Sequence, residues 1–160
     1  MRKIVVTLIL IAISITGCGN DTSRPADLPP LFPCEITITQ EGTPLAGATV
    51  ALEAFGGTGS VYHPAGITDE SGKAVMSTYG FNGVPAGTYK VTVRKTVVED
   101  GAEIIDSYGD PARAPGAEYR AVEQQYSNAA TTPHEIEITG ERGIARATFD
   151  VGRPIRERRL

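Results

Sequence analysis

The sequence offers few side chains of the types that carry out chemistry, and their spacing selects no catalytic group. The two histidines, His63 and His134, lie far apart in the chain. Nucleophilic catalysis needs a serine or cysteine beside a histidine and an acid, and no segment brings these residue types together. Tyrosines and His134 could still converge in space on iron, so a non-haem iron enzyme stays a remote alternative. We therefore expect a non-enzymatic protein, with no catalytic residue and no cofactor.

Three tyrosines are the candidate binding residues. Tyr108, Tyr119 and Tyr126 lie in a polar stretch, 96–132, that is interrupted by Asp110-Pro111 and Ala114-Pro115-Gly116. So long an irregular segment within a compact domain is commonly functional. Exposed aromatic rings that share one face could stack on sugar rings, which would make the protein a carbohydrate-binding module. The chain has no Trp and its tyrosines are scattered, so this is the second-ranked function.

Acidic side chains in the same stretch could in principle hold a calcium ion, because Ca²⁺ prefers several oxygen ligands. Asp106, Asp110 and neighbouring acidic residues are the candidates. Their spacing matches no EF-hand or comparable loop, so we expect a solvated acidic loop and predict no metal site.

The elements that must position these residues are short β-strands. Between Cys34 and Lys95 four runs alternate apolar and polar residues with period two, the pattern of strands that bury one face. Turn sequences rich in Gly, Pro and Asp separate the runs, as in a β-sandwich or barrel. The apolar sides of these runs are Cys34/Ile36/Ile38, Val50/Leu52/Ala54, Ala74/Met76 and Tyr89/Val91/Val93.

Three segments within these runs resemble one known family. GTPLAGATV (residues 42–50), TDESGKA (68–74) and VPAGTYKVTV (84–93) resemble, in order, the conserved segments of the carboxypeptidase regulatory-like domain. The resemblance implies a transthyretin-like (prealbumin-like) fold, a single Greek-key β-sandwich of about seven strands. It implies little about function, because this sandwich carries many unrelated activities. Hydroxyisourate hydrolases of this fold end in Tyr-Arg-Gly-Ser, whereas residues 157–160 here read ERRL.

The N-terminus resembles the signal of a bacterial lipoprotein. A basic start is followed by an apolar run that is too short to span a bilayer, and Ile15-Thr16-Gly17-Cys18 then resembles a lipobox. The resemblance implies removal of residues 1–17 and acylation of Cys18, with chains such as palmitate that hold the protein on a membrane. Lipidated Cys18 would leave Cys34 without a disulfide partner, as a small buried hydrophobe.

The next segment, 18–33, is polar and rich in Pro, and it is predicted to be a tether between lipid and domain. Gly19 follows the lipidated cysteine, where an Asp would resemble an inner-membrane retention signal. We therefore expect an exported protein anchored in the cell envelope, in the outer membrane if the cell has two membranes.

The remaining boundaries follow from the change in pattern after Lys95. The β-sandwich domain is predicted over 34–151, and its stretch 96–132 forms one long loop, with room for a short helix near 117–125. A closing hairpin of two strands is predicted to start at His134. Residues 152–160 form a basic tail that we expect to be solvated and disordered.

The net charge limits the partners. The formal charge is −4 at pH 7, and removal of Arg2 and Lys3 with the signal would make the mature chain more acidic. This argues against a nucleic-acid-binding protein. The sequence therefore predicts a structural or interaction module at the cell envelope, attached to the membrane through Cys18, with an envelope protein or a glycan as its possible partner.

Overall fold

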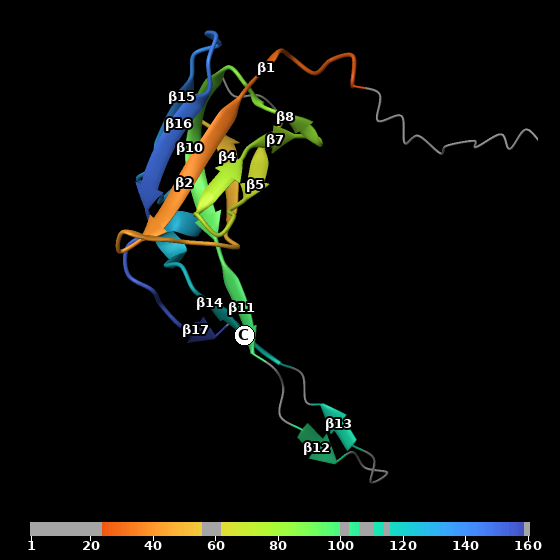
Figure 1. Ribbon diagram of the computed structural model, residues 1–160, viewed down its shortest axis with the longest axis vertical. Helices are drawn as coiled ribbons and strands as arrows, with labels where there is room; N and C mark the ends of the chain where they lie inside the picture. Colours follow the sequence, from red (N-terminus) through yellow and green to blue (C-terminus); the bar gives the residue numbers. More distant parts are fainter. Residues whose placement is uncertain (1–23, 56–61, 100–102, 106–110, 114–115, 159–160) are drawn as a thin grey trace, which may run out of the picture.

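The protein is an all-β sandwich, as the alternating pattern predicts. The computed structural model describes residues 24–55, 62–99, 103–105, 111–113 and 116–158. Regular structure within these residues is β-strand, apart from one short 3₁₀ helix, η1 (Gln124–Ser127). Two sheets face each other, and a narrow ribbon of strands leaves the sandwich at one end (Figure 1).

The larger sheet of the sandwich has six strands in the order β15-β10-β4-β5-β7-β8. Neighbouring strands in this sheet are all antiparallel. β10 is the longest of these strands and is paired on both sides, with β4 and with the edge strand β15. The strands are β4 (Thr49–Ala54), β5 (Ala65–Ile67), β7 (Ser77–Thr78), β8 (Phe81–Asn82), β10 (Gly87–Arg94) and β15 (Glu135–Ile138).

The smaller sheet is built on β2 (Cys34–Gln40). β3 (Thr43–Pro44) and β6 (Lys73–Val75) pair with it antiparallel, whereas β16 (Ala145–Asp150) pairs with it parallel, from Cys34↔Ala145 to Thr39↔Asp150. The first long strand and the last long strand of the domain therefore lie side by side (Figure 1). The predicted closing hairpin is wrong, because β15 pairs with β10 in the larger sheet while β16 belongs to this one. Two further short strands, β1 (Leu31–Phe32) and β9 (Val84–Pro85), pair at the edge of the sandwich.

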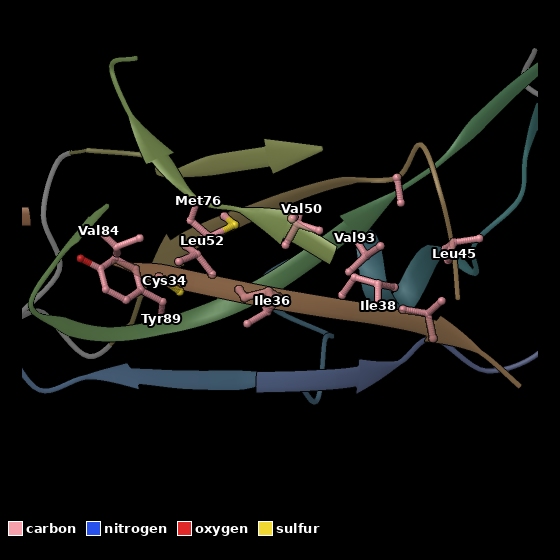
Figure 2. Close-up of a cluster of buried hydrophobic side chains, with 14 of the residues drawn as sticks. Cys34, Ile36, Ile38, Leu45, Val50, Leu52, Met76, Val84, Tyr89 and Val93 are labelled. Atoms are coloured by element: carbon pink, nitrogen blue, oxygen red, sulfur yellow. The ribbon is translucent and has the colours of Figure 1, made fainter. Parts of the chain in front are cut away.

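The core lies between the two sheets and contains most of the residues that the alternation selects (Figure 2). Ala54 is an exception, because it lies at the exposed end of β4. Core residues such as Val84 and Val122 lie outside the predicted runs. The side chains of Ile36, Leu52 and Tyr89 have no exposed surface. Cys34 is 1% exposed, and burial raises the pKa of its thiol to about 11. A thiol that stays protonated at neutral pH is a poor nucleophile, which confirms that Cys34 is a small buried hydrophobe.

One predicted strand is divided between the sheets. β6 pairs with β2, and β7 pairs with β5 of the larger sheet. Met76 lies between them, fully buried, and its N–H donates to the Cys34 carbonyl at 3.0 Å. A strand that changes sheets closes a corner of a sandwich, so the single apolar run around Met76 serves both layers.

The Asp69–Gly72 segment forms the tight hairpin that its sequence predicts. Asp69 Oδ1 accepts hydrogen bonds from the Ser71 hydroxyl and from the N–H groups of Ser71 and Lys73, at 2.6–3.0 Å. These bonds, led by that of the hydroxyl, hold the pKa of the Asp69 carboxyl below its ordinary value. Gly72 has φ +76°, and a Cβ there would lie 2.5 Å from the Ile38 carbonyl oxygen. Glycine is thus required by both conformation and space.

The structure differs from the expected loop over 96–132. Two strands, β11 (Thr96–Glu99) and β14 (Ala117–Arg120), pair antiparallel there, and β12 (Glu103–Ile105) pairs with β13 (Pro111–Arg113). The helix considered near 117–125 is replaced by β14 and η1. All four residues of β11 are exposed. β11 and β14 contain no buried residue. Because neither strand packs a face into the core, their sequences lack the alternation that indicates a strand.

The expected disordered tail and the expected tether also differ from the described residues. In the tail, β17 (Glu157–Arg158) pairs with β14, and Arg156 forms an ion pair with Glu99. The tail is therefore held in place by ion pairing and by addition of β17 to the edge of β14. At the other end, the Arg24 guanidinium donates a 2.7 Å hydrogen bond to the Pro29 carbonyl. The strand β1 also lies within the segment that is predicted to be a tether.

Candidate binding groove

A polar groove of about 460 Å³ lies where the ribbon joins the sandwich. One side of it is the outward face of the larger sheet, and the other is formed by the start of β11, the end of β14 and the turn around η1, which lie together at one end of the sandwich (Figure 1). Its lining residues are Glu53, Thr92, Arg94, Lys95, Thr96, Arg120, Val122, Gln124, Ser127, Asn128 and Ala129.

Strand alternation positions the floor of the groove. Val91 and Val93 of β10 point into the core, so Thr92 and Arg94 between and after them point outward. Thr92 is only 3% exposed, because the turn around η1 lies beside it, and its hydroxyl donates to the Ala51 carbonyl at 3.3 Å. Val122, 1% exposed, belongs to the hydrophobic core and anchors the opposite wall.

Two arginines fix the walls of the groove. The Arg94 guanidinium donates from Nε and Nη2 to the Ser127 carbonyl, at 3.3 and 3.0 Å, and so ties β10 to the end of η1. Arg120 Nη1 donates to Gln124 Oε1 at 3.3 Å and pairs with Glu157 Oε2 of the tail at 3.0 Å. Both guanidinium groups keep further N–H donors, because each has five.

Lys95 differs from the arginines because its ammonium has no hydrogen-bond or ion-pair partner in the part of the chain that the structure describes. It lies at the joint between β10 and β11, beside Arg94. Among the described residues, the groove is therefore lined by three cationic side chains and one carboxylate, that of Glu53. Glu53 pairs with His63 Nδ1 at 3.0 Å. This arrangement suits an anionic ligand that also carries hydroxyl or amide groups.

The structure does not join the predicted binding residues into one aromatic face. Tyr108 lies outside the described residues, as does Cys18. Tyr119, on β14, is covered by the Arg156 guanidinium, 4.4 Å from the ring centroid. Tyr126, in η1, packs against the core and stacks on the His134 ring, with centroids 5.2 Å apart and an interplanar angle of 13°. Neither of these two rings lines the groove.

Sequence reasoning missed the cations that line the groove. Arg94 and Lys95 were assigned only to the end of a strand, and Arg120 lay in the expected loop. The one available signal was the pair of adjacent basic residues at 94–95 in an acidic protein. That pair could not reveal Arg120, which is brought close by the pairing of β11 with β14.

Neither histidine belongs to a metal site in the described residues, where no group of three His, Cys, Asp or Glu side chains has the geometry to hold an ion. His134 Nε2 lies 3.0 Å from the Asp150 carbonyl oxygen, and its ring packs between Tyr126 and Phe149. The acidic residues considered for calcium, Asp106 and Asp110, lie outside the described residues.

The packing of His134 predicts a pH dependence of stability. Burial lowers the pKa of the His134 imidazole from its ordinary value of 6.5, against the smaller opposing effect of the Asp150 carbonyl. The unfolded chain therefore binds a proton more readily than the folded one, so stability falls as pH drops below about 6.5. We expect the thermal midpoint to decline from pH 7 to pH 5, and to decline less in His134→Phe, which keeps the aromatic packing. Equal slopes in the two proteins would contradict this.

Comparison with known proteins assigns no family. No protein-family model matches the chain, and no curated protein sequence is significantly similar to it. Among solved structures, BcpA, the major pilin subunit of Bacillus cereus, is similar with a TM-score of 0.41 and 15% identity over 77% of this chain. The match spans 30% of the pilin chain. A 9R-lipoxygenase from Cyanothece gives a TM-score of 0.29 and 15% identity, over 77% of this chain and 16% of that chain.

Within the described residues, the structure contains no helix with the length and apolar character that a membrane span requires. The apolar N-terminal run and Cys18 lie outside these residues, so membrane attachment is a prediction from the sequence alone.

Proposed function

We propose that the protein is a non-enzymatic interaction module of the cell envelope, attached to a membrane through Cys18, whose β-sandwich binds an anionic partner in the groove. The observation that carries the proposal is the lining of this groove by Arg94, Lys95 and Arg120 in a chain whose net charge is −4. A concave site lined by one sign of charge concentrates ligands of the opposite sign.

The form of the groove supports binding more than chemistry. The two arginines are held in place by the Ser127 carbonyl and by Glu157, so they present fixed donors. Planar guanidinium groups recognise carboxylates and phosphates through paired hydrogen bonds. The Lys95 ammonium has no hydrogen-bond or ion-pair partner within the described structure. Its charge is therefore available to pair with an anionic ligand.

A second candidate function is binding of a carbohydrate through its hydroxyl groups. The amides of Gln124 and Asn128 and the hydroxyls of Thr92 and Thr96 line the same groove and suit sugar hydroxyls. No Tyr or Phe of the described residues lines it, so the stacking that was expected from Tyr119 and Tyr126 does not support this candidate. A sugar held there would depend on polar contacts.

The two candidates are separated by a panel of polymers tested on the detergent-solubilised full chain. Polygalacturonate carries sugar rings and carboxylates, poly-glutamate carries carboxylates only, and dextran carries sugar hydroxyls only. We expect both acidic polymers to raise the thermal midpoint at low salt, and less at high salt, because salt screens exposed charges. A shift with dextran alone would favour the carbohydrate-binding module, and no shift with any polymer would contradict both.

Lys95→Gln is expected to weaken binding of the acidic polymers several-fold while leaving the midpoint of the free protein unchanged, because the ammonium holds no other group of the described structure. Titration calorimetry measures the affinity. Lys73→Gln is the matched control, since Lys73 is an exposed lysine on the β6 hairpin that does not line the groove. An equal loss of affinity in both variants would show that overall charge, and not the groove, governs binding.

A further inference from the structure

β11 is the outer strand of the ribbon, and its free backbone edge is a candidate surface for a partner. In the ribbon the strand order is β11-β14-β17, so β11 has a neighbouring strand on one side only within the part of the chain that the structure describes. All four of its residues are exposed, with Val97 at 43% and Val98 at 64%. An open strand edge with exposed apolar side chains is a template for pairing with another strand.

The hydrogen bonds to β14 fix which backbone groups of β11 face the open edge. The Ala121 N–H donates to the Lys95 carbonyl at 2.9 Å. Lys95 and Ala121 therefore form a hydrogen-bonded pair, and the backbone carbonyl of Lys95 points toward the strand that contains β14. Hydrogen-bonded and non-hydrogen-bonded pairs alternate along an antiparallel strand. Val97 and Glu99 therefore also direct their backbone N–H and C=O groups toward β14. Thr96 and Val98 therefore present their N–H and C=O groups at the open edge.

This alternation permits a symmetric pairing of β11 with β11 of a second copy, centred on Val97. Thr96 of each copy then exchanges hydrogen bonds with Val98 of the other, and Val97 faces Val97 in a non-hydrogen-bonded pair. The side chains of such a pair approach most closely, with Cα atoms about 4.5 Å apart. Tyr119, which is opposite Val97 on β14, extends the apolar row on the same face.

The charges on β11 are complementary in this register. Lys95 and Glu99 lie equally far from Val97 along the strand, so Lys95 of each copy faces Glu99 of the other. The Lys95 ammonium, which has no partner in the described structure, gains a carboxylate. Glu99 already pairs with Arg156, and a carboxylate can accept from two cations. Opposite charges directly across two strands stabilise the pair.

We propose that two copies of the protein associate through antiparallel pairing of their β11 strands about Val97. The ribbon leaves the sandwich before β11 begins (Figure 1), and the antiparallel arrangement places the two sandwiches at opposite ends of the shared sheet. A contact of four residues a side buries little surface, so the association is weak in dilute solution. A shared membrane surface would raise the effective concentration.

A single cysteine on the pairing axis tests the proposal in the full-length protein in membranes under mild oxidation. Disulfides need Cα atoms about 4.4–6.8 Å apart, which the facing Val97 positions satisfy. We expect Val97→Cys to give a reducible dimer on a non-reducing gel. Val98→Cys is the matched control, because residue 98 is more exposed but lies off the axis and on the opposite face of the ribbon. We expect several-fold less dimer there.

Other outcomes overturn the proposal. If Val98→Cys cross-links as well as Val97→Cys, random collision explains the dimer; if neither cross-links, the edge does not pair. The unmodified chain, with Cys18 and Cys34, is the blank. Adding Lys95→Glu to Val97→Cys should reduce the dimer several-fold through repulsion from Glu99, while adding Lys73→Glu should not. Val97 does not line the groove, so the result at this position is independent of whether the groove binds an anion.

Discussion

Tyr89→Ala is expected to lower the free energy of unfolding by about 3–5 kcal/mol, the usual cost of removing a large aromatic side chain from a core. Tyr89 has no exposed surface and lies in β10, which is paired on both sides, with β4 and β15. Domains of this kind are stable by only about 5–15 kcal/mol. We therefore expect a greatly reduced urea midpoint, and loss of the folded state at moderate temperature.

Two control variants separate packing from polar effects at this site. Tyr89→Phe keeps the ring but removes the hydroxyl that donates to the Pro85 carbonyl at 2.9 Å, at a cost of about 1 kcal/mol. Tyr79→Ala removes a tyrosine that is 60% exposed and should change the midpoint little. If Tyr89→Ala lowers the free energy of unfolding no more than Tyr79→Ala does, Tyr89 does not contribute the packing of a buried core residue.

Cys18→Ser is expected to move nearly all of the protein from the membrane fraction to the soluble fraction. The lipobox-like segment predicts that Cys18 carries acyl chains, and each buried methylene contributes about 0.8 kcal/mol to membrane binding. Serine at this position cannot be lipidated through a thiol. The measurement is immunoblotting of membrane and soluble fractions after cell lysis and a salt wash.

Cys34→Ala is the matched control for loss of a cysteine. Cys34 is buried in the core, so this variant should stay with the membranes even if its stability falls. Retention of Cys18→Ser in the salt-washed membrane fraction would contradict lipid anchoring. It would then point to attachment by another part of the chain.

Much of the fold was predictable because burial leaves a periodic trace in the sequence. Ile36, Leu52 and Val91 belong to alternating runs, and each is fully buried. The Asp69–Gly72 turn was also recognisable, because its hydrogen bonds and its positive φ depend on residues within the turn. Such features are local, so neighbouring residues are sufficient to indicate them.

The strands of the ribbon could not be predicted in the same way. β11 is exposed along its whole length and β14 contains no buried residue, so neither strand has a core-facing pattern. They are defined by their pairing with each other and with the tail strand β17. The basic tail was expected to be solvated, yet Arg156 lies over the Tyr119 ring. Contacts between residues almost 40 positions apart leave no periodic trace in either segment.

The sequence by itself determined the all-β class and most of the core-facing residues, and the lipid attachment at Cys18 stays a prediction from the sequence. Only the tertiary structure decided the groove. Glu53, Arg94 and Arg120 come from two sandwich strands and the ribbon, and they meet because β4 pairs with β10 while β14 returns along β11. The physical reason is that an exposed charged side chain is compatible with many backbone positions, whereas a buried apolar one is not. Hydrophobic burial therefore constrains the sequence pattern, and a surface site is defined only once the strands have paired.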